Sequence, residues 1–164
     1  MKFFKWMFWA GAAFLLQTQF SFSLGRPNIT VVLVYYYGLT SVAGLNSRDI
    51  RGSRPEIESV AFGALVGLAE DVISGPLLGP SLLSKGLIGF LTPLLFMDVI
   101  FRWTPLWAGM IVSLFTVMDG VIVIGAGMVF GDLNVNMTHA VRELAFQVLI
   151  NILLSMGLRP GEYD

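Results

Sequence analysis

The chain has 164 residues, of which 55% are hydrophobic and only 13% charged, and its mean hydropathy is +0.77. A soluble domain averages about 45–50% apolar and about 25% charged residues, so this composition indicates a protein whose solvent is lipid. The net charge of −1, with no basic run, gives no indication of nucleic-acid binding. The lack of cysteine excludes disulfides and thiolate sites, and a single histidine, His139, argues against a histidine-based metal site. The length fits one integral membrane domain, residues 1–164.

The amino-terminal segment allows three interpretations. Lys2 and Lys5 precede an apolar run from residue 6 to 16, and Ser21 to Ser23 follows it, as in a secretory signal peptide with a small-residue cleavage site. Because the rest of the chain is also apolar, we favour an uncleaved first span. The alternatives are a cleaved peptide or a five-span bundle without a stable first helix.

Apolar segments of about the 20 residues that cross a bilayer recur along the whole chain. The expected spans are residues 4–24, 28–45, 57–74, 79–101, 105–130 and 139–158. Pro27, Pro55 and Pro105 each precede an apolar run, where the first turn of a helix accepts proline. Pro93 lies inside the fourth span and predicts a kink. The sequence therefore predicts an all-α fold, a polytopic membrane helix bundle with about six transmembrane helices.

Basic residues predict the orientation of these spans. With the amino terminus inside, the cytoplasmic side receives seven of them, Lys2, Lys5, Arg48, Arg51, Arg54, Arg102 and Arg159. The outer side receives Arg26, and Arg142 lies at the outer mouth of the last span. Cytoplasmic loops carry an excess of Lys and Arg, so both termini are expected in the cytoplasm. The arginines of the loop 46–58 (Arg48, Arg51 and Arg54) are either a topology anchor or a docking surface for a cytoplasmic partner.

Charged residues flank the turn between the third and fourth spans. Asp71 precedes the centre of the turn 75–80 by six to seven residues, and Lys85 follows it by seven to eight. At about 1.5 Å per residue, both lie about 10 Å below the turn. A pair between Lys85 and either Asp71 or Glu70 would lower the cost of inserting both charges. We expect such a structural ion pair, with binding of a partner or ligand as the alternative.

Three other charged residues are candidates for a role inside the membrane. Asp119 lies near the middle of the fifth span, where Lys85 is the one basic residue that could match its depth. It is either a cavity-facing proton or cation site, or a protonated and hydrogen-bonded acid, because burial disfavours the charged form. Arg142 and Glu143 open the last span near the outer surface, where a local pair or a contact with lipid headgroups satisfies them.

Small residues indicate where helices approach one another. Gly63 and Gly67 form one G-x-x-x-G pattern, and Gly127 and Gly131 form another. This spacing lets helix backbones come close together in membranes. It predicts tight packing on the third and fifth spans without naming the partner helix.

Motifs of the common enzyme classes are missing from the sequence. It contains no G-x-S-x-G, no H-E-x-x-H, no phosphate-binding loop and no nucleophile with a histidine base. We therefore expect no enzymatic activity and no cofactor.

Residues 63–91 resemble the signature hairpin of the bacterial rod-shape-determining MreD family. The family's G-L-x-x-D element, small-residue pair and following L-G read here as Gly67 to Asp71, Ser74–Gly75 and Leu78–Gly79. An apolar helix rich in Gly and Leu follows, up to Leu91. The entry to the second span departs from the family, which commonly has Asp where Asn28 stands.

The resemblance implies a non-enzymatic subunit of the cell-wall elongation machinery, or elongasome, in the bacterial inner membrane, needed for rod shape and peptidoglycan synthesis. The implied partners are a MreC-type bitopic membrane protein and, as further candidates, the actin-like MreB and the elongation glycosyltransferase and transpeptidase. The family fold is similar to the substrate-binding subunit of energy-coupling-factor transporters. The alternative function is therefore a membrane subunit for vitamin-type uptake, and a third is an ion-coupled carrier using Asp119 and Asp71.

Overall fold

The computed structural model describes residues 2–19, 27–43, 54–74, 77–99, 104–130 and 136–158, and these are helical throughout apart from short helix-flanking residues, with no strand. The predicted all-α bundle is confirmed. The helices are α1 (Lys2–Gln19), α2 (Ile29–Ala43), α3 (Pro55–Ser74), α4 (Pro80–Leu94), α5 (Pro105–Phe130) and α6 (Met137–Gly157), with a π-helical turn, η1 (Leu95–Val99), after α4. Each predicted span overlaps one helix, and α6 begins two residues earlier than expected.

The apolar character of the helices is strongest in the second half of the chain. Among the described residues, three stretches are long and apolar enough to cross a membrane: Pro80–Met97, Pro105–Phe130 and Met137–Gly157. Residues Ile29–Val42 form a shorter apolar helix. The carboxylates of α3 (Glu56, Glu58, Glu70 and Asp71) make that helix more polar. Length and composition therefore identify a membrane protein, and they single out fewer spans than the six expected.

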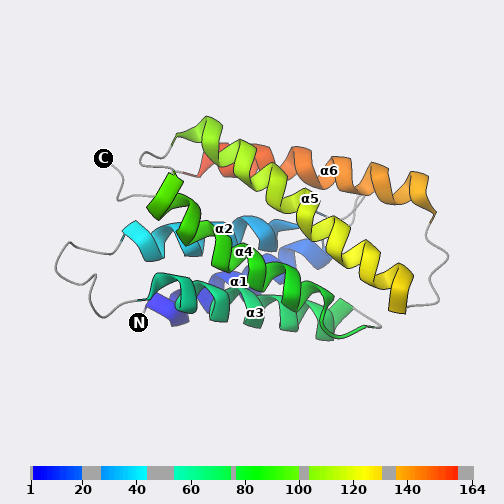
Figure 1. Cartoon of the computed structure of the whole chain (residues 1–164). Coiled ribbons are helices and arrows are strands. Elements are labelled where there is room, and N and C mark those ends of the chain that lie inside the picture. The colour runs from blue at the N-terminus through cyan, green and yellow to red at the C-terminus, as the bar shows by residue number, and fades with distance from the viewer. Residues whose placement is uncertain are drawn as a thin grey trace.

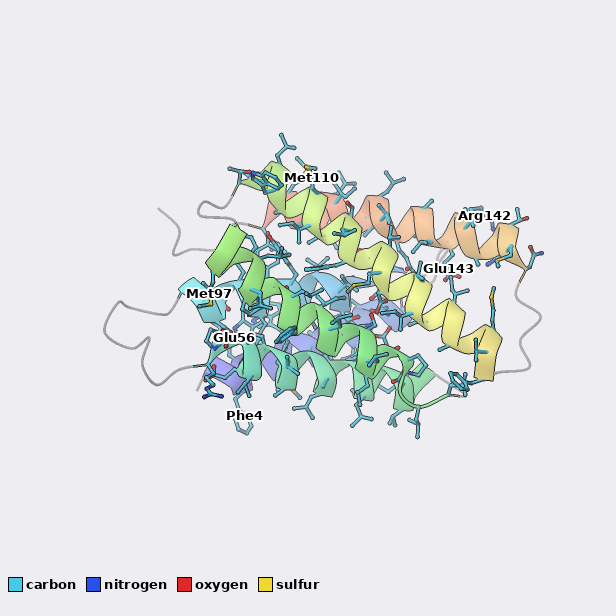
Figure 2. The ribbon with its side chains drawn as sticks, viewed as in Figure 1. Phe4, Glu56, Met97, Met110, Arg142 and Glu143 are labelled. Atoms are coloured by element: carbon cyan, nitrogen blue, oxygen red, sulfur yellow. The ribbon has the colours of Figure 1, made fainter. Side chains whose placement is uncertain are left out.

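Large apolar side chains cover much of the outer surface of the bundle. Phe4, Leu106 and Leu153 are each at least 69% exposed, and Met110 is 55% exposed. Figure 2 shows Phe4 and Met110 pointing away from the helices on opposite sides of the bundle. A water-soluble monomer rarely exposes apolar surface on this scale, and in a bilayer the same side chains face lipid.

Helices α3 and α4 form the tightest pair, an antiparallel hairpin. A methyl group added at Gly63 would lie 2.2 Å from the backbone oxygen of Lys85, and one added at Gly67 would lie 2.2 Å from that of Ser81. Gly89 approaches the backbone oxygen of Ser59 equally closely. The helix that packs against the first G-x-x-x-G pattern, Gly63 and Gly67, is therefore α4.

Proline changes the helix type at the far end of α4. Pro93 lies inside the helix and has no N–H to donate to the preceding turn. Two residues later the chain passes into the π-helical turn η1, after a cap in which the N–H of Leu95 reaches the carbonyls of Leu91 and Thr92. The disturbance predicted as a kink takes the form of this local change in winding.

The second half of the chain forms a helix pair of its own. Helix α5 packs mainly on α6, to which it lies at an angle, and it runs alongside α4 (Figure 1). Asn151 Nδ2 donates to Thr116 Oγ1 at 2.9 Å, with both side chains fully buried between α5 and α6. The Tyr36 hydroxyl of α2 lies within hydrogen-bonding distance of the carbonyls of Ser155 and Leu158, which fixes the end of α6 to the core.

Aromatic side chains fill the core between α1, α2 and α3. The rings of Tyr37 and Phe62 stack with centroids 4.0 Å apart, and Trp6 packs edge-on against both. Tyr35 is fully buried and contacts Phe115 of α5. This apolar core leaves the opposite end of the bundle, where α3 ends and α4 begins, for the polar groups.

Candidate functional site

A buried lysine lies at the centre of the polar end of the bundle. Lys85, on the second turn of α4, is fully buried, and its Nζ lies 2.8 Å from Glu70 Oε2 and 3.1 Å from Asp119 Oδ1. Glu70 comes from the end of α3 and Asp119 from the middle of α5. One ammonium therefore joins three helices, and the predicted hairpin ion pair is present with Glu70 as its partner. We call Glu70, Lys85 and Asp119 the charged triad.

Hydrogen bonds from neutral side chains complete the surroundings of Asp119. Ser84 donates to one carboxylate oxygen and the Nδ2 of Asn28 donates to the other. Thr30 lies 2.8 Å from the Asn28 side-chain oxygen and 3.0 Å from Glu70 Oε2. Asp119 thus accepts hydrogen bonds from the two neutral side chains and from the ammonium of Lys85 together.

Asp71 has a different role from the one expected of it. Its carboxylate accepts hydrogen bonds from the backbone N–H groups of Gly79, Ser81 and Leu82 at 2.9–3.0 Å. The first N–H groups of a helix have no partner within it, and α4 begins at Pro80 with no side-chain cap of its own from Gly79. Asp71 therefore caps α4 from the neighbouring helix. Of the two partners predicted for Lys85 on α3, Glu70 forms the ion pair and Asp71 does not.

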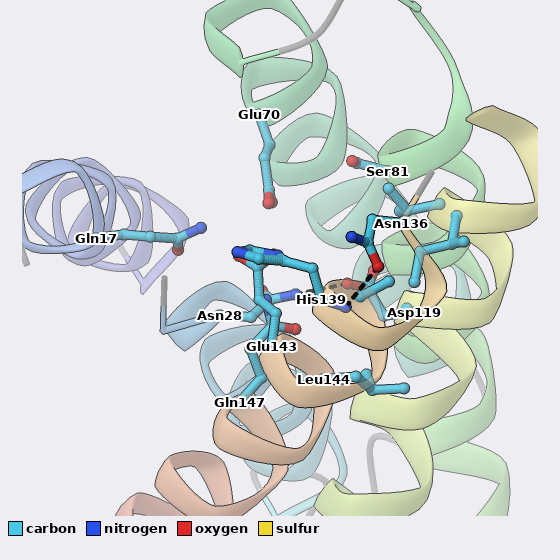
Figure 3. A pocket seen from close by; sticks show the side chains of 14 residues that line it. Gln17, Asn28, Glu70, Ser81, Asp119, Asn136, His139, Glu143, Leu144 and Gln147 are labelled. Carbon is cyan, nitrogen blue, oxygen red and sulfur yellow. Dashed lines mark hydrogen bonds and ion pairs between the residues drawn. The ribbon is translucent and has the colours of Figure 1, made fainter. Parts of the chain in front are cut away.

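A pocket of about 430 Å³ opens beside the charged triad. Side chains from α1, α3, α4, α5 and α6, together with Asn28 before α2, line it. Figure 3 shows Gln17 of α1 and Glu70 of α3 directed toward the region of His139 on α6. Two kinds of side chain line the pocket: polar ones, among them Gln17, Asn28, Glu70, Asp119, Glu143 and Gln147, and apolar ones, Val123, Ile124, Ala140 and Leu144.

The first turns of α6 form one wall of this pocket. Asn136 caps the helix by accepting hydrogen bonds from the N–H groups of Thr138 and His139. His139 Nδ1 lies 4.0 Å from Glu143 Oε2, with the histidine side chain 61% exposed. Glu143 lines the pocket, whereas the exposed Arg142 does not. Figure 2 shows both residues on the same end of α6.

Of the predicted cytoplasmic docking residues, the described one, Arg54, lies apart from this site. Arg54 is exposed immediately before α3, at the opposite end of that helix from Glu70. Arg48 and Arg51 lie outside the described residues, as does Gly131 of the second G-x-x-x-G pattern.

Several residues of the site are not identified as binding residues by the sequence. Asn28, Thr30 and Ser84 are single polar residues at helix starts, where capping and turn chemistry explains them equally well. Gln17 lies in the polar end of α1, before Thr18 and Gln19, and Gln147 is one of several polar residues on α6, so neither stands out as a binding residue. A search for polar residues within predicted spans finds these positions, but only the folded bundle brings them to one pocket.

Comparison of the chain with protein-family models, with curated proteins and with solved structures finds no match in any of the three. The structure itself limits the chemistry of the site. Among the described residues, no group of three or more His, Cys, Asp or Glu side chains is placed to hold a metal ion. The site is thus a hydrogen-bonding and charged pocket within a membrane protein.

Proposed function

We propose that this protein is a non-enzymatic, multi-pass subunit of the bacterial cell-wall elongation machinery in the inner membrane, with six spans and both termini in the cytoplasm. It acts by scaffolding a MreC-type bitopic protein. MreB and the elongation glycosyltransferase and transpeptidase are further partners in the same assembly.

The observation that carries the proposal is the α3–α4 hairpin. The residues that resemble the MreD signature have defined tasks in this fold. Gly67 allows the backbone of α4 to approach, and Asp71 holds the start of α4. These residues of the motif therefore serve to hold the two helices of the hairpin together. A scaffold needs such a fixed arrangement, because it works through the shape of its helix surfaces.

The ends of the chain support the proposed orientation. The start of α1 and the end of α6 lie at the same end of the bundle, where the N and C labels stand in Figure 1. The pocket is lined from the last turns of α1 and α3 and the first turns of α4 and α6, and these parts of the helices lie toward the other end of the bundle in Figure 1. With the seven-to-two asymmetry of basic residues, the pocket then opens toward the outer face of the membrane.

Depletion of the protein in its rod-shaped host tests the proposal. We expect the cells to become round and swollen, and the tagged protein to co-isolate with the bitopic partner from gently solubilised membranes. Complementation with Asp71→Ala should fail to restore rods, whereas Val72→Ala, at a neighbouring position that is 67% exposed, should restore them. Rod-shaped cells after full depletion would contradict the proposal.

The pocket favours a second candidate, a substrate-binding subunit for uptake of a vitamin-type molecule. Its volume of about 430 Å³ lies within the range of about 300–1,000 Å³ that small-molecule pockets have. A ligand at 100 times its dissociation constant stabilises a protein by about 2.7 kcal/mol. A clear melting shift with one vitamin, together with normal rods after depletion, would support uptake and overturn the scaffold.

A further inference from the structure

We propose that the open pocket beside the charged triad binds a small organic cation, an amine with a compact apolar body. This inference goes beyond the proposed function, because it concerns what occupies the pocket and holds for a scaffold as well as for an uptake subunit.

Size is the first argument. At about 430 Å³ the pocket has room for a molecule of several functional groups, and the share of one water in the liquid is only about 30 Å³. A bare monovalent ion would leave most of this volume to water. The space therefore fits a molecule rather than an ion.

Charge is the second argument. Carboxylates from α3, α5 and α6 line the pocket: Glu70, Asp119 and Glu143. Among the described residues that line it there is no lysine or arginine, and His139 is the single basic side chain. The ammonium of Lys85 is fully buried behind the wall, between Glu70 and Asp119. The accessible carboxylate surface comes mainly from Glu143, whose side chain is 33% exposed, and in smaller part from Glu70, at 14%. It favours a ligand that donates hydrogen bonds and carries positive charge.

An amide oxygen gives independent support for a donor in this place. Gln17 Oε1 is buried and has no hydrogen-bond partner among the described residues, although Gln17 lines the pocket. Most buried polar atoms in folded proteins have a partner, so an atom without one points to a missing donor. An ammonium or amine N–H placed between Gln17 and the acidic wall supplies it.

The apolar wall of the pocket indicates the chemistry of the rest of the ligand. Val123 and Ile124 of α5 and Leu144 of α6 line the pocket with apolar side chains. A divalent metal ion would find no cluster of three ligating side chains among the described residues and would gain nothing from this wall. An amine with an apolar body makes use of both walls.

Binding to the purified full-length protein in detergent tests the inference. The probes are phenethylamine, its acid analogue phenylacetate and its neutral analogue 2-phenylethanol, each measured by calorimetry and by thermal shift up to millimolar concentration. We expect the amine to bind and to raise the melting temperature, and the acid and the alcohol to do so at least about tenfold more weakly, because they lack the charged donor.

Two variants place the binding in the pocket. Ala140→Trp fills the space and should weaken amine binding by at least about tenfold, whereas Val141→Trp, at the next position and 65% exposed, should leave it unchanged. Glu143→Gln removes one charge without disturbing the triad and should weaken binding by up to about tenfold. This second variant keeps the test decisive if Ala140→Trp folds poorly.

Three results would overturn the inference: no binding of the amine at millimolar concentration, equal binding of the acid, or amine binding that neither Ala140→Trp nor Glu143→Gln weakens. Binding is measured on purified protein and rod shape in depleted cells, so either proposal can fail while the other stands.

Discussion

Replacement of Lys85 by methionine should strongly destabilise the bundle at its polar end. The ammonium is fully buried and holds Glu70 at 2.8 Å and Asp119 at 3.1 Å. Methionine has a similar length and fills the same space, so the change mainly removes the charge. Removing one partner of a buried ionic group costs about 3–5 kcal/mol, because the remaining charges stay buried without compensation. Two carboxylates that share one cation also repel each other once it is gone.

A double-mutant cycle isolates this interaction from the general cost of mutation. Lys85→Met and Asp119→Asn are combined, and unfolding of each purified variant is followed by SDS titration in mild detergent. We expect the double variant to recover part of the loss, with a coupling free energy of about 1–3 kcal/mol. The control cycle uses His139→Gln and Glu143→Gln, whose side chains lie 4.0 Å apart and are 61% and 33% exposed. An exposed pair contributes about 0–1 kcal/mol, so its coupling should be much smaller.

The result that refutes this reasoning is additivity. If the loss in the Lys85→Met and Asp119→Asn double variant equals the sum of the two single losses, the two side chains do not interact in the folded protein. Equal coupling in the two cycles would likewise show that burial adds nothing to the pair.

The hairpin and the topology give three further predictions. Gly63→Ala should lower the free energy of unfolding by at least about 1–3 kcal/mol, because its methyl group would lie 2.2 Å from a backbone oxygen of α4. Gly86→Ala, whose methyl group would lie 3.7 Å from its nearest neighbour, should cost little, and SDS titration of both variants measures the difference. Asp71→Ala leaves three N–H groups without their acceptor and should cost about 3 kcal/mol or more in the same assay, and a loss below 1 kcal/mol would contradict the capping role. In this cysteine-free chain, Leu78→Cys should react with an impermeant thiol reagent from outside and Ser53→Cys should not; the reverse pattern would invert the orientation.

Counting residues from the turn was enough to predict that Lys85 has an acidic partner on α3. It was not enough to choose between Glu70 and Asp71, because adjacent residues on a helix differ little in depth and point about 100° apart. The choice depends on how α3 is rotated against α4, which the close approach at Gly63 and Gly67 determines. In that rotation Asp71 meets the N–H groups at the start of α4, and Glu70 meets the lysine.

Asp119 illustrates a second limit of the sequence. Its place near the middle of α5 gives a depth only if the helix runs straight across the membrane. Instead α5, with 26 residues, lies at an angle to α3 and α6 and runs alongside α4 (Figure 1). The tilt of a long span is determined by its packing against neighbours and not by its own length. The pairing of Asp119 with Lys85 therefore follows from how α5 packs along α4, to which no local sequence pattern corresponds.

The charged triad and the pocket have two carboxylates in common, and this links packing to binding. Glu70 and Asp119 hold Lys85 on one side and line the pocket on the other. These carboxylates join the α3–α4 hairpin to α5, and α5 in turn packs closely on α6. A cation in the pocket interacts with the same two carboxylates. Its binding and the packing of α3–α4 against α5 are therefore coupled, and each changes the free energy of the other by the same amount. In the scaffold proposed above, the pocket thus lies where an occupant could alter how the two helix pairs fit together.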